Sequence, residues 1–140
     1  MLTILLVDND PDDYELLQAA LEHIDKEGKV VYTEGCEDLL SIVIKHKPDI
    51  VFIDINMPGI NGIECLRGIR VHQDFNALPI IMYSTSSNKV NIQQSFDNNA
   101  NLYIIKPHSF QGIIEALQRV LKIDWKRQLK PTLSDFVIAS

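Results

Sequence analysis

Short apolar runs alternate with longer amphipathic segments along almost the whole chain. Five runs have the length and the Val, Ile and Leu content of buried strands, and they cover residues 2–8, 29–33, 49–54, 79–84 and 102–106. Near-continuous apolar strands are typical of parallel sheets buried on both faces. Because strands that alternate with helices form right-handed βαβ units, the pattern predicts an α/β fold with a doubly wound, five-stranded parallel sheet. The run at 29–33 is the most polar and suits a sheet edge.

Five helices are predicted between and after these strands. The first begins at Asp10 and carries its apolar stripe to Ile24, and the others lie at about residues 37–46, 61–72, 87–98 and 109–124. Asp10 is suited to cap the first helix and Pro11 to its first position. The helix at 109–124 has the clearest 3.6-residue period, whereas the helix at 87–98 has a thin apolar stripe. We therefore expect little burial in the fourth helix.

The composition of the chain limits the classes of protein to which it can belong. A chain of 140 residues with 46% hydrophobic residues is long enough for one domain with a substantial core. The net charge of −6 makes nucleic acid an unexpected partner. No apolar stretch approaches the ~20 residues that span a bilayer, and the N-terminus lacks the basic region of a signal peptide. These features favour a soluble, cytoplasmic protein without membrane contact.

The two cysteines, Cys36 and Cys65, form neither a disulfide framework nor a metal motif. Each is assigned to a helical stretch and is interpreted as a small packed residue in a reducing compartment. The four histidines show no ligand spacing to one another, so they are assigned to the surface or to loops.

Four of the five predicted strands end on a chemically distinctive residue. These residues are Asp8, Asp54, Ser84 and Lys106. Because the carboxyl ends of parallel strands meet at one edge of an open α/β sheet, we expect their side chains to converge there. A carboxylate nucleophile, a further carboxylate, a hydroxyl and an ammonium group together suit the handling of a phosphoryl group.

The residues around these strand ends resemble the receiver domain of two-component response regulators. The matching segments are Val7-Asp8-Asn9-Asp10, Asp54 to Gly62 with its Met57-Pro58 pair, Ser84, and Lys106-Pro107. Each segment alone is a weak signal, but four in order at strand ends are a strong one. The resemblance implies strand order 2-1-3-4-5 with five helices, a receiver domain at residues 1–124 and a C-terminal tail at 125–140.

The resemblance also implies a role for each residue at the edge. Asp54 is the expected phosphoacceptor, because a carboxylate can attack phosphorus and hold the group as an acyl phosphate; a turn or capping aspartate is the alternative for Asp54 taken alone. Ser84 is expected to donate a hydrogen bond to a phosphoryl oxygen, and Lys106 to neutralise its charge. The family's Lys-Pro bond is cis, so a cis bond is expected before Pro107.

A magnesium site is expected beside the phosphoacceptor. By resemblance, Mg²⁺ would be held by Asp8, Asn9, Asp54 and the backbone carbonyl of Asn56. The family has two adjacent acids after the first strand, and Asn9 replaces the second of them. Since this removes one formal charge, we expect weaker Mg²⁺ binding than in a receiver with both acids. Asp10 is a possible compensating ligand, although helix capping is the simpler role.

The expected output is a protein contact. By resemblance, phosphorylation draws Ser84 toward the phosphoryl group, and Tyr103 then turns inward, which alters the face formed by the fourth helix, the fifth strand and the fifth helix. The expected function is that of a single-domain response regulator, which takes a phosphoryl group from a sensor histidine kinase or phosphotransfer protein and contacts a downstream protein. The apolar end of the tail is expected to pack on the domain or on a second copy, so a homodimer is possible.

Three alternatives remain open from the residues alone. An aspartate-nucleophile phosphohydrolase also places an aspartate at a strand end. Such enzymes carry a D-x-D motif, whereas this chain has Asn56 in place of the second aspartate. A flavodoxin-like cofactor binder shares the fold, yet it needs a phosphate-binding loop where this chain is acidic. The third alternative is a degenerate receiver that only binds a partner, and Asn9 keeps it open.

Overall fold

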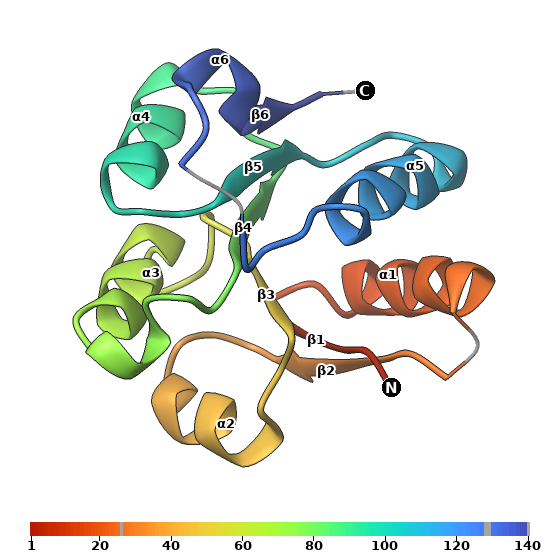
Figure 1. Ribbon diagram of the computed structural model, residues 1–140, viewed down its shortest axis with the longest axis horizontal. Coiled ribbons are helices and arrows are strands. Elements are labelled where there is room, and N and C mark those ends of the chain that lie inside the picture. Colours follow the sequence, from red (N-terminus) through yellow and green to blue (C-terminus); the bar gives the residue numbers. More distant parts are fainter. Residues whose placement is uncertain (26, 128–129, 140) are drawn as a thin grey trace.

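The computed structural model describes residues 1–25, 27–127 and 130–139. Its centre is a parallel six-stranded sheet in the order β2-β1-β3-β4-β5-β6 (Figure 1). The strands are β1 (Thr3–Val7), β2 (Lys29–Thr33), β3 (Ile50–Ile53), β4 (Ile80–Ser84), β5 (Leu102–Ile105) and β6 (Val137–Ile138). The α/β fold class and the order of the first five strands are confirmed, and β2 lies at an edge as expected.

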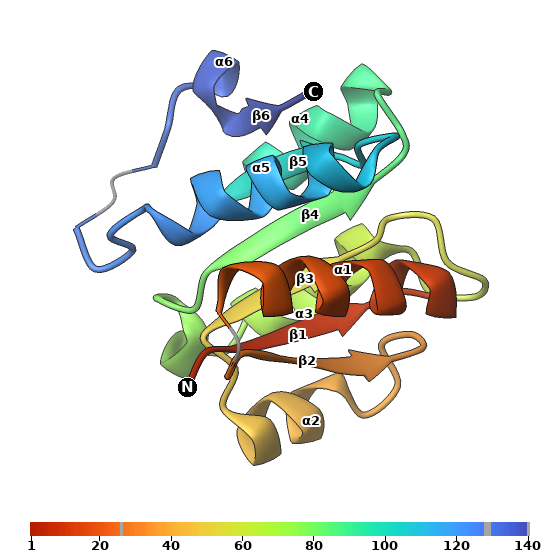
Figure 2. The same cartoon turned by 90° about the vertical axis from the view of Figure 1, so that its right-hand side faces the viewer.

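Helices cover both faces of the sheet. One face carries α1 (Pro11–Ile24) and α5 (Phe110–Leu121), which lie side by side in Figure 2. The other carries α2 (Leu39–His46), α3 (Gly62–Arg70) and α4 (Lys89–Asp97) (Figure 1). Each face has its own apolar cluster, with Leu17, Leu21 and Leu117 in one and Leu66 and Ile69 in the other. The predicted thin burial of α4 is confirmed, because Ser95 is its one buried residue.

Local capping explains why four helices begin where they do. The Oδ1 atom of Asp10 accepts a hydrogen bond from the backbone N–H of Asp12 at 2.9 Å, and Pro11 opens α1. In the same way, side-chain oxygens of Asn61, Asn88 and Ser109 cap α3, α4 and α5. These caps satisfy N–H groups that lack helical partners. They also fix the helix N-termini at the carboxyl edge of the sheet.

The predicted counts of five strands and five helices were too low. A short helix, α6 (Leu133–Phe136), and the strand β6 follow α5, and a single 3₁₀ turn, η1 (Gln73–Phe75), precedes β4. The strand β6 is only two residues long and pairs in parallel with β5. A run this short carries no readable period, so pairing with an available sheet edge decides its conformation. The expectation that the apolar end of the tail packs on the domain is confirmed.

The interpretation of the cysteines as separate packed residues was wrong. The structure pairs Cys36 with Cys65 as a disulfide, with their Cα atoms 5.7 Å apart. Cys36 lies in the turn before α2, outside the helix in which it was expected, and Cys65 lies in the first half of α3. The two positions are 29 residues apart in the sequence, and only the packing of α2 beside α3 brings them together.

Among the described residues, no helix is long and apolar enough to cross a membrane.

Candidate functional site

Strand register brings the predicted site residues to one edge. Val7 of β1 lies opposite Ile53 of β3, so the residues that follow them, Asp8 and Asp54, are neighbours. On the other side of β3, Ser84 ends β4 and lies opposite Ile105, the residue before Lys106. The predicted convergence of Asp8, Asp54 and Lys106 at the carboxyl edge is therefore confirmed.

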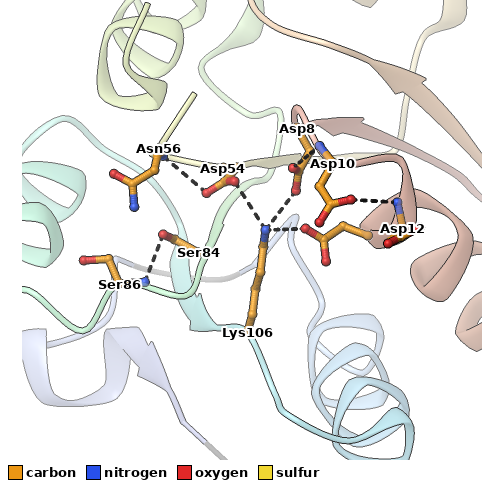
Figure 3. A network of polar contacts seen from close by, with 9 residues as sticks. Asp8, Asp10, Asp12, Asp54, Asn56, Ser84, Ser86 and Lys106 are labelled. Carbon is orange, nitrogen blue, oxygen red and sulfur yellow. Dashed lines mark hydrogen bonds and ion pairs between the residues drawn. The ribbon is translucent and has the colours of Figure 1, made fainter. Parts of the chain in front are cut away.

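Lys106 forms the centre of a cluster of three carboxylates (Figure 3). Its Nζ atom lies 2.6 Å from an oxygen of Asp13, 3.0 Å from one of Asp8 and 3.3 Å from one of Asp54. The lysine side chain is 10% exposed and that of Asp8 is fully buried. One ammonium group thus faces three carboxylates in a partly buried setting, and these four groups carry a net negative charge when all are ionised.

Burial dominates the titration of Asp8. It raises the pKa of the Asp8 carboxyl from 3.8 to about 6, although the charge and hydrogen bond of Lys106 and a backbone N–H act in the opposite direction. Burial alone would lower the pKa of Lys106, but its hydrogen bond to Asp13 and the charges of Asp54 and Asp8 outweigh burial and raise it. Lys106 is therefore a permanent cation, while Asp8 ionises at a cost.

Backbone N–H groups hold the two central carboxylates in place. The Oδ1 atom of Asp8 accepts from the N–H of Asp10 at 3.0 Å, and that of Asp54 accepts from the N–H of Asn56 at 3.3 Å. Each carboxylate thereby turns its other oxygen toward Lys106. A Cβ atom on Gly62 would collide with the backbone carbonyl of Asp54, so only glycine allows α3 to begin this close to the acceptor.

Ser84 is buried beside this cluster and is linked to Tyr103. Its Oγ atom accepts from the N–H of Ser86 at 3.1 Å, and the carbonyl of Ser86 accepts from the Tyr103 hydroxyl at 2.8 Å. Tyr103 is fully buried, so its ring already points inward. The expectation that it turns inward only on phosphorylation therefore does not describe this structure. Burial raises the pKa of the Tyr103 hydroxyl, which stays protonated as a donor.

The remaining predicted residues lie at the rim. The side chains of Asn9 and Asn56 are exposed, and Asp10 serves as the cap of α1. Asp13 was missed as a site residue, although its place in the first turn of a helix that begins at this edge was a usable signal. The Lys106–Pro107 bond is trans, contrary to the expected cis bond; trans is the ordinarily favoured isomer, by about 0.5–1 kcal/mol.

The donor set of the site fits a hard cation. Asp8 and Asp54 offer neighbouring carboxylate oxygens, and the cluster has more carboxylates than ammonium groups, which is the setting in which Mg²⁺ binds through oxygen ligands and retained waters. Among the described residues, no group of three or more His, Cys, Asp or Glu side chains is arranged to hold a metal by itself. A cation here would therefore rely on backbone carbonyl and water ligands as well.

Comparison with known proteins identifies the family of this chain. A family model described as the response regulator receiver domain matches residues 4–118. The chain belongs to the response regulator receiver family. As a receiver domain, it is a phosphoacceptor of two-component signal transduction. Receiver domains are generally non-enzymatic, and they interact with histidine kinases or phosphotransfer proteins. This membership favours the receiver interpretation over the phosphohydrolase and the cofactor binder.

Two relatives show the range of contexts in which this receiver domain occurs. Protein PilH of Pseudomonas aeruginosa is 30% identical over 86% of the chain, and the match covers 98% of PilH. The phosphate regulon transcriptional regulatory protein PhoB of the same organism is also 30% identical over 86% of the chain. That match covers 52% of PhoB, so the chain spans about half the length of this second relative.

Solved structures share the fold at lower identity. The response regulator RPA3017 in red light signalling of R. palustris has a TM-score of 0.79 and 21% identity. The match covers 94% of the present chain and 99% of the RPA3017 chain. The Mn²⁺-bound form of the response regulator Rcp1 has a TM-score of 0.75 and 19% identity, with coverage of 94% and 100%. At these identities the likeness concerns the fold alone.

Proposed function

We propose that Asp54 is the phosphoacceptor of this receiver, that Ser84 and Lys106 bind the transferred group, and that a sensor histidine kinase or a phosphotransfer protein donates it. The position of Lys106 is the observation that carries the proposal. Its ammonium group lies 3.3 Å from Asp54 and is fixed there by Asp8 and Asp13. A preorganised cation at the acceptor needs no rearrangement when negative charge arrives.

The chemistry assigned to the chain is a single displacement. A carboxylate oxygen of Asp54 forms the new bond to phosphorus while the bond to the donor's histidine nitrogen breaks, which leaves an acyl phosphate on Asp54. Lys106 stabilises the added charge, and the buried hydroxyl of Ser84 is placed to donate to a phosphoryl oxygen. The same groups assist the later hydrolysis of the acyl phosphate, so the chain contributes to its own phosphorylation and dephosphorylation.

Mg²⁺ is the proposed cofactor. Asp8, Asp54 and the backbone carbonyl of Asn56 would hold it, with Asn9 as a neutral ligand at the exposed rim, and the ion would neutralise charge on the phosphoryl oxygens. The raised pKa of Asp8 supports this assignment, because a buried carboxylate that ionises at a cost gains from a nearby cation. The Mn²⁺-bound form of Rcp1 is a structural precedent for a divalent ion on this fold.

Intact-mass measurement tests the proposal. The wild type and the Asp54→Asn variant are incubated with Mg²⁺ and acetyl phosphate, and Asp12→Asn is a matched control because Asp12 is an exposed acid in the first turn of α1. The wild type and Asp12→Asn should each gain one phosphoryl group, and Asp54→Asn should gain none. A wild type that gains none with acetyl phosphate or with a phosphorylated phosphotransfer protein would support the degenerate receiver. Multiple turnovers of a generic phosphate ester would support a phosphohydrolase.

We also propose a cytoplasmic location and output through α4, β5 and α5. The output proposal is supported by Tyr103, which lies in β5 and is linked to Ser84 through Ser86.

A further inference from the structure

The closest partner of Lys106 is an acid that the proposed metal site does not use. The Nζ atom lies 2.6 Å from an oxygen of Asp13, against 3.0 Å for Asp8 and 3.3 Å for Asp54. All three contacts are hydrogen bonds, so the three N–H groups of the ammonium have three carboxylate acceptors. Figure 3 shows Lys106 facing Asp8 and Asp54, the carboxylates proposed to hold Mg²⁺. Among the described residues, Asp13 is the one ionic partner of Lys106 outside that pair.

The first turn of α1 fixes Asp13 in this place. Its backbone N–H donates to the carbonyl of Asp10 at 3.1 Å, and Pro11 opens the helix. One turn further along, Leu17 is buried in the apolar cluster between the sheet and the helices α1 and α5, and residues four apart share a helix face. The stripe that anchors α1 to the sheet therefore continues to Asp13, whose side chain is only 21% exposed.

The charge count of the cluster shows what Asp13 contributes. Three ionised carboxylates and one ammonium group leave two negative charges, which match one divalent cation. Without Asp13, the ammonium charge would fall on Asp8 and Asp54 alone, and one negative charge would remain. Because Coulomb attraction falls with distance, the oxygen at 2.6 Å balances the largest part of the lysine charge. Asp13 thereby leaves the charge of Asp8 and Asp54 available to a metal ion.

The residues before Asp13 show why this contribution matters. Asn9 is exposed and stands where a receiver with two adjacent acids has the second of them. Asp10 was the alternative source of the missing charge, but its Oδ1 atom accepts from the N–H of Asp12 as the cap of α1. Asp13 is the acid that enters the cluster, and it restores the charge count through Lys106.

We propose that Asp13 is a positioning residue that balances the charge of Lys106, so that the charge of the proposed metal ligands stays available to Mg²⁺. This inference rests on the proposed function, because it concerns the same lysine and the same metal site. Asp13 contacts Lys106 and is not itself a metal ligand. It compensates in part for the acid that is absent at position 9.

Calorimetric titration of Mg²⁺ into the full chain tests the compensation. Asp13→Asn keeps the size of the side chain and removes its charge, so it should bind Mg²⁺ roughly tenfold more weakly than the wild type. Asp12→Asn makes the same change in net charge at an exposed neighbouring position, and it should bind as the wild type does at about 0.15 M ionic strength, where exposed charges are largely screened.

A second acid at position 9 should rescue the loss. The double variant Asn9→Asp/Asp13→Asn should return to within about threefold of the wild-type affinity, because the charge count of the site is restored. An Asp13→Asn affinity equal to that of the wild type, or a double variant as weak as Asp13→Asn, overturns the proposal.

Nuclear magnetic resonance of the lysine ammonium groups tests the contact itself in the metal-free protein. Ammonium hydrogens held in hydrogen bonds exchange slowly with water, and the Lys106 signal is the one absent from Lys106→Met. In Asp13→Asn these hydrogens should exchange roughly tenfold faster than in the wild type and in Asp12→Asn, because a neutral amide replaces the charged acceptor. Backbone amide spectra of the same samples show that each variant is folded. Equal exchange in Asp13→Asn and the wild type overturns the positioning role.

The two measurements separate this inference from the proposed function. A wild type that binds no Mg²⁺ counts against the proposed metal site and overturns the compensation with it. A wild type that binds Mg²⁺ no better than Asp13→Asn does overturns the inference alone. At saturating Mg²⁺, the Lys106 hydrogens of the wild type should still exchange more slowly than those of Asp13→Asn. If they exchange equally fast, Asp13 has left the lysine for the metal ion, and its assignment as a positioning residue is wrong.

Discussion

Replacing a buried carboxylate of the site should stabilise the metal-free protein. Asp8 is fully buried, and its pKa rises from 3.8 to about 6 on folding, mainly because burial penalises its charge. A group whose folded pKa is raised contributes stability below its unfolded pKa, and that stability is lost as pH rises through the folded pKa. A rise of about two pKa units, at about 1.4 kcal/mol each, lowers the free energy of unfolding by about 3 kcal/mol at pH 8 and by about half of that at pH 5.

The Asp8→Asn variant removes this penalty while its amide oxygen can still accept from the N–H of Asp10. We expect its free energy of unfolding to exceed that of the wild type by up to about 3 kcal/mol at pH 8, with the gain falling to about half at pH 5. The assay is urea unfolding followed by the fluorescence of Trp125, in the presence of a chelator so that no divalent ion offsets the charge. Asp8→Asn should nevertheless lose Mg²⁺-dependent phosphorylation.

The control is Asp12→Asn, which removes an exposed acid from the first turn of α1. Because an acid in the first turn interacts favourably with the helix dipole, its loss should lower the free energy of unfolding by less than about 1 kcal/mol. The free energy of unfolding of this control should not exceed that of the wild type between pH 5 and pH 8. If Asp8→Asn is less stable than the wild type at pH 8, or if its advantage does not grow with pH, burial is not the dominant influence on this carboxylate.

Three further perturbations test other parts of the structure. Lys106→Met leaves three neighbouring carboxylates without their cation, so the free energy of unfolding at pH 7 should fall by about 3–5 kcal/mol in urea titrations. A fall of less than about 1 kcal/mol would contradict the central role of this lysine. Asn9→Asp adds a charge beside the proposed metal site and should tighten Mg²⁺ binding roughly tenfold by calorimetric titration, where equal affinities would show that the side chain is not a ligand. Reduction by dithiothreitol, or Cys36→Ser, should lower the free energy of unfolding by about 3–4 kcal/mol, since the disulfide closes a loop of 29 residues; alkylation of both thiols in untreated native protein would argue that the pair is reduced.

Parallel strands explain why so much of the site was predictable. Once the runs that end at Asp8, Asp54 and Lys106 are read as parallel strands of one sheet, their last residues must share an edge, and the order of the strands follows from the family resemblance. Helix starts were predictable for the same local reasons, since Asp10 and Pro11 cap and open α1 without help from tertiary structure. These features depend on contacts within one element or between elements whose pairing is fixed.

The features that escaped prediction depend on packing between distant segments. Asp13 joins the site because α1 places its first turn above the sheet edge. Its place in that first turn was a signal, but its contact with Lys106 depends on how α1 packs on the sheet. Cys36 and Cys65 meet only because α2 and α3 are neighbours, and the strand β6 exists only because the edge of β5 is available to it. In each case the residue type was visible, whereas its partner was fixed by the assembled fold.

The charge balance of the site shows which groups must compensate a phosphoryl group on Asp54. Lys106 already contacts three carboxylates, so it cannot by itself neutralise the additional negative charge of a phosphoryl group on Asp54. A divalent ion and the Ser84 hydroxyl are the remaining sources of compensation, and a hydroxyl donor must come within ~3 Å of the phosphoryl oxygen to contribute. We expect Asn9, which removes one acid from the proposed metal site, to weaken Mg²⁺ binding, so phosphorylation of the wild type should require a higher Mg²⁺ concentration than phosphorylation of the Asn9→Asp variant.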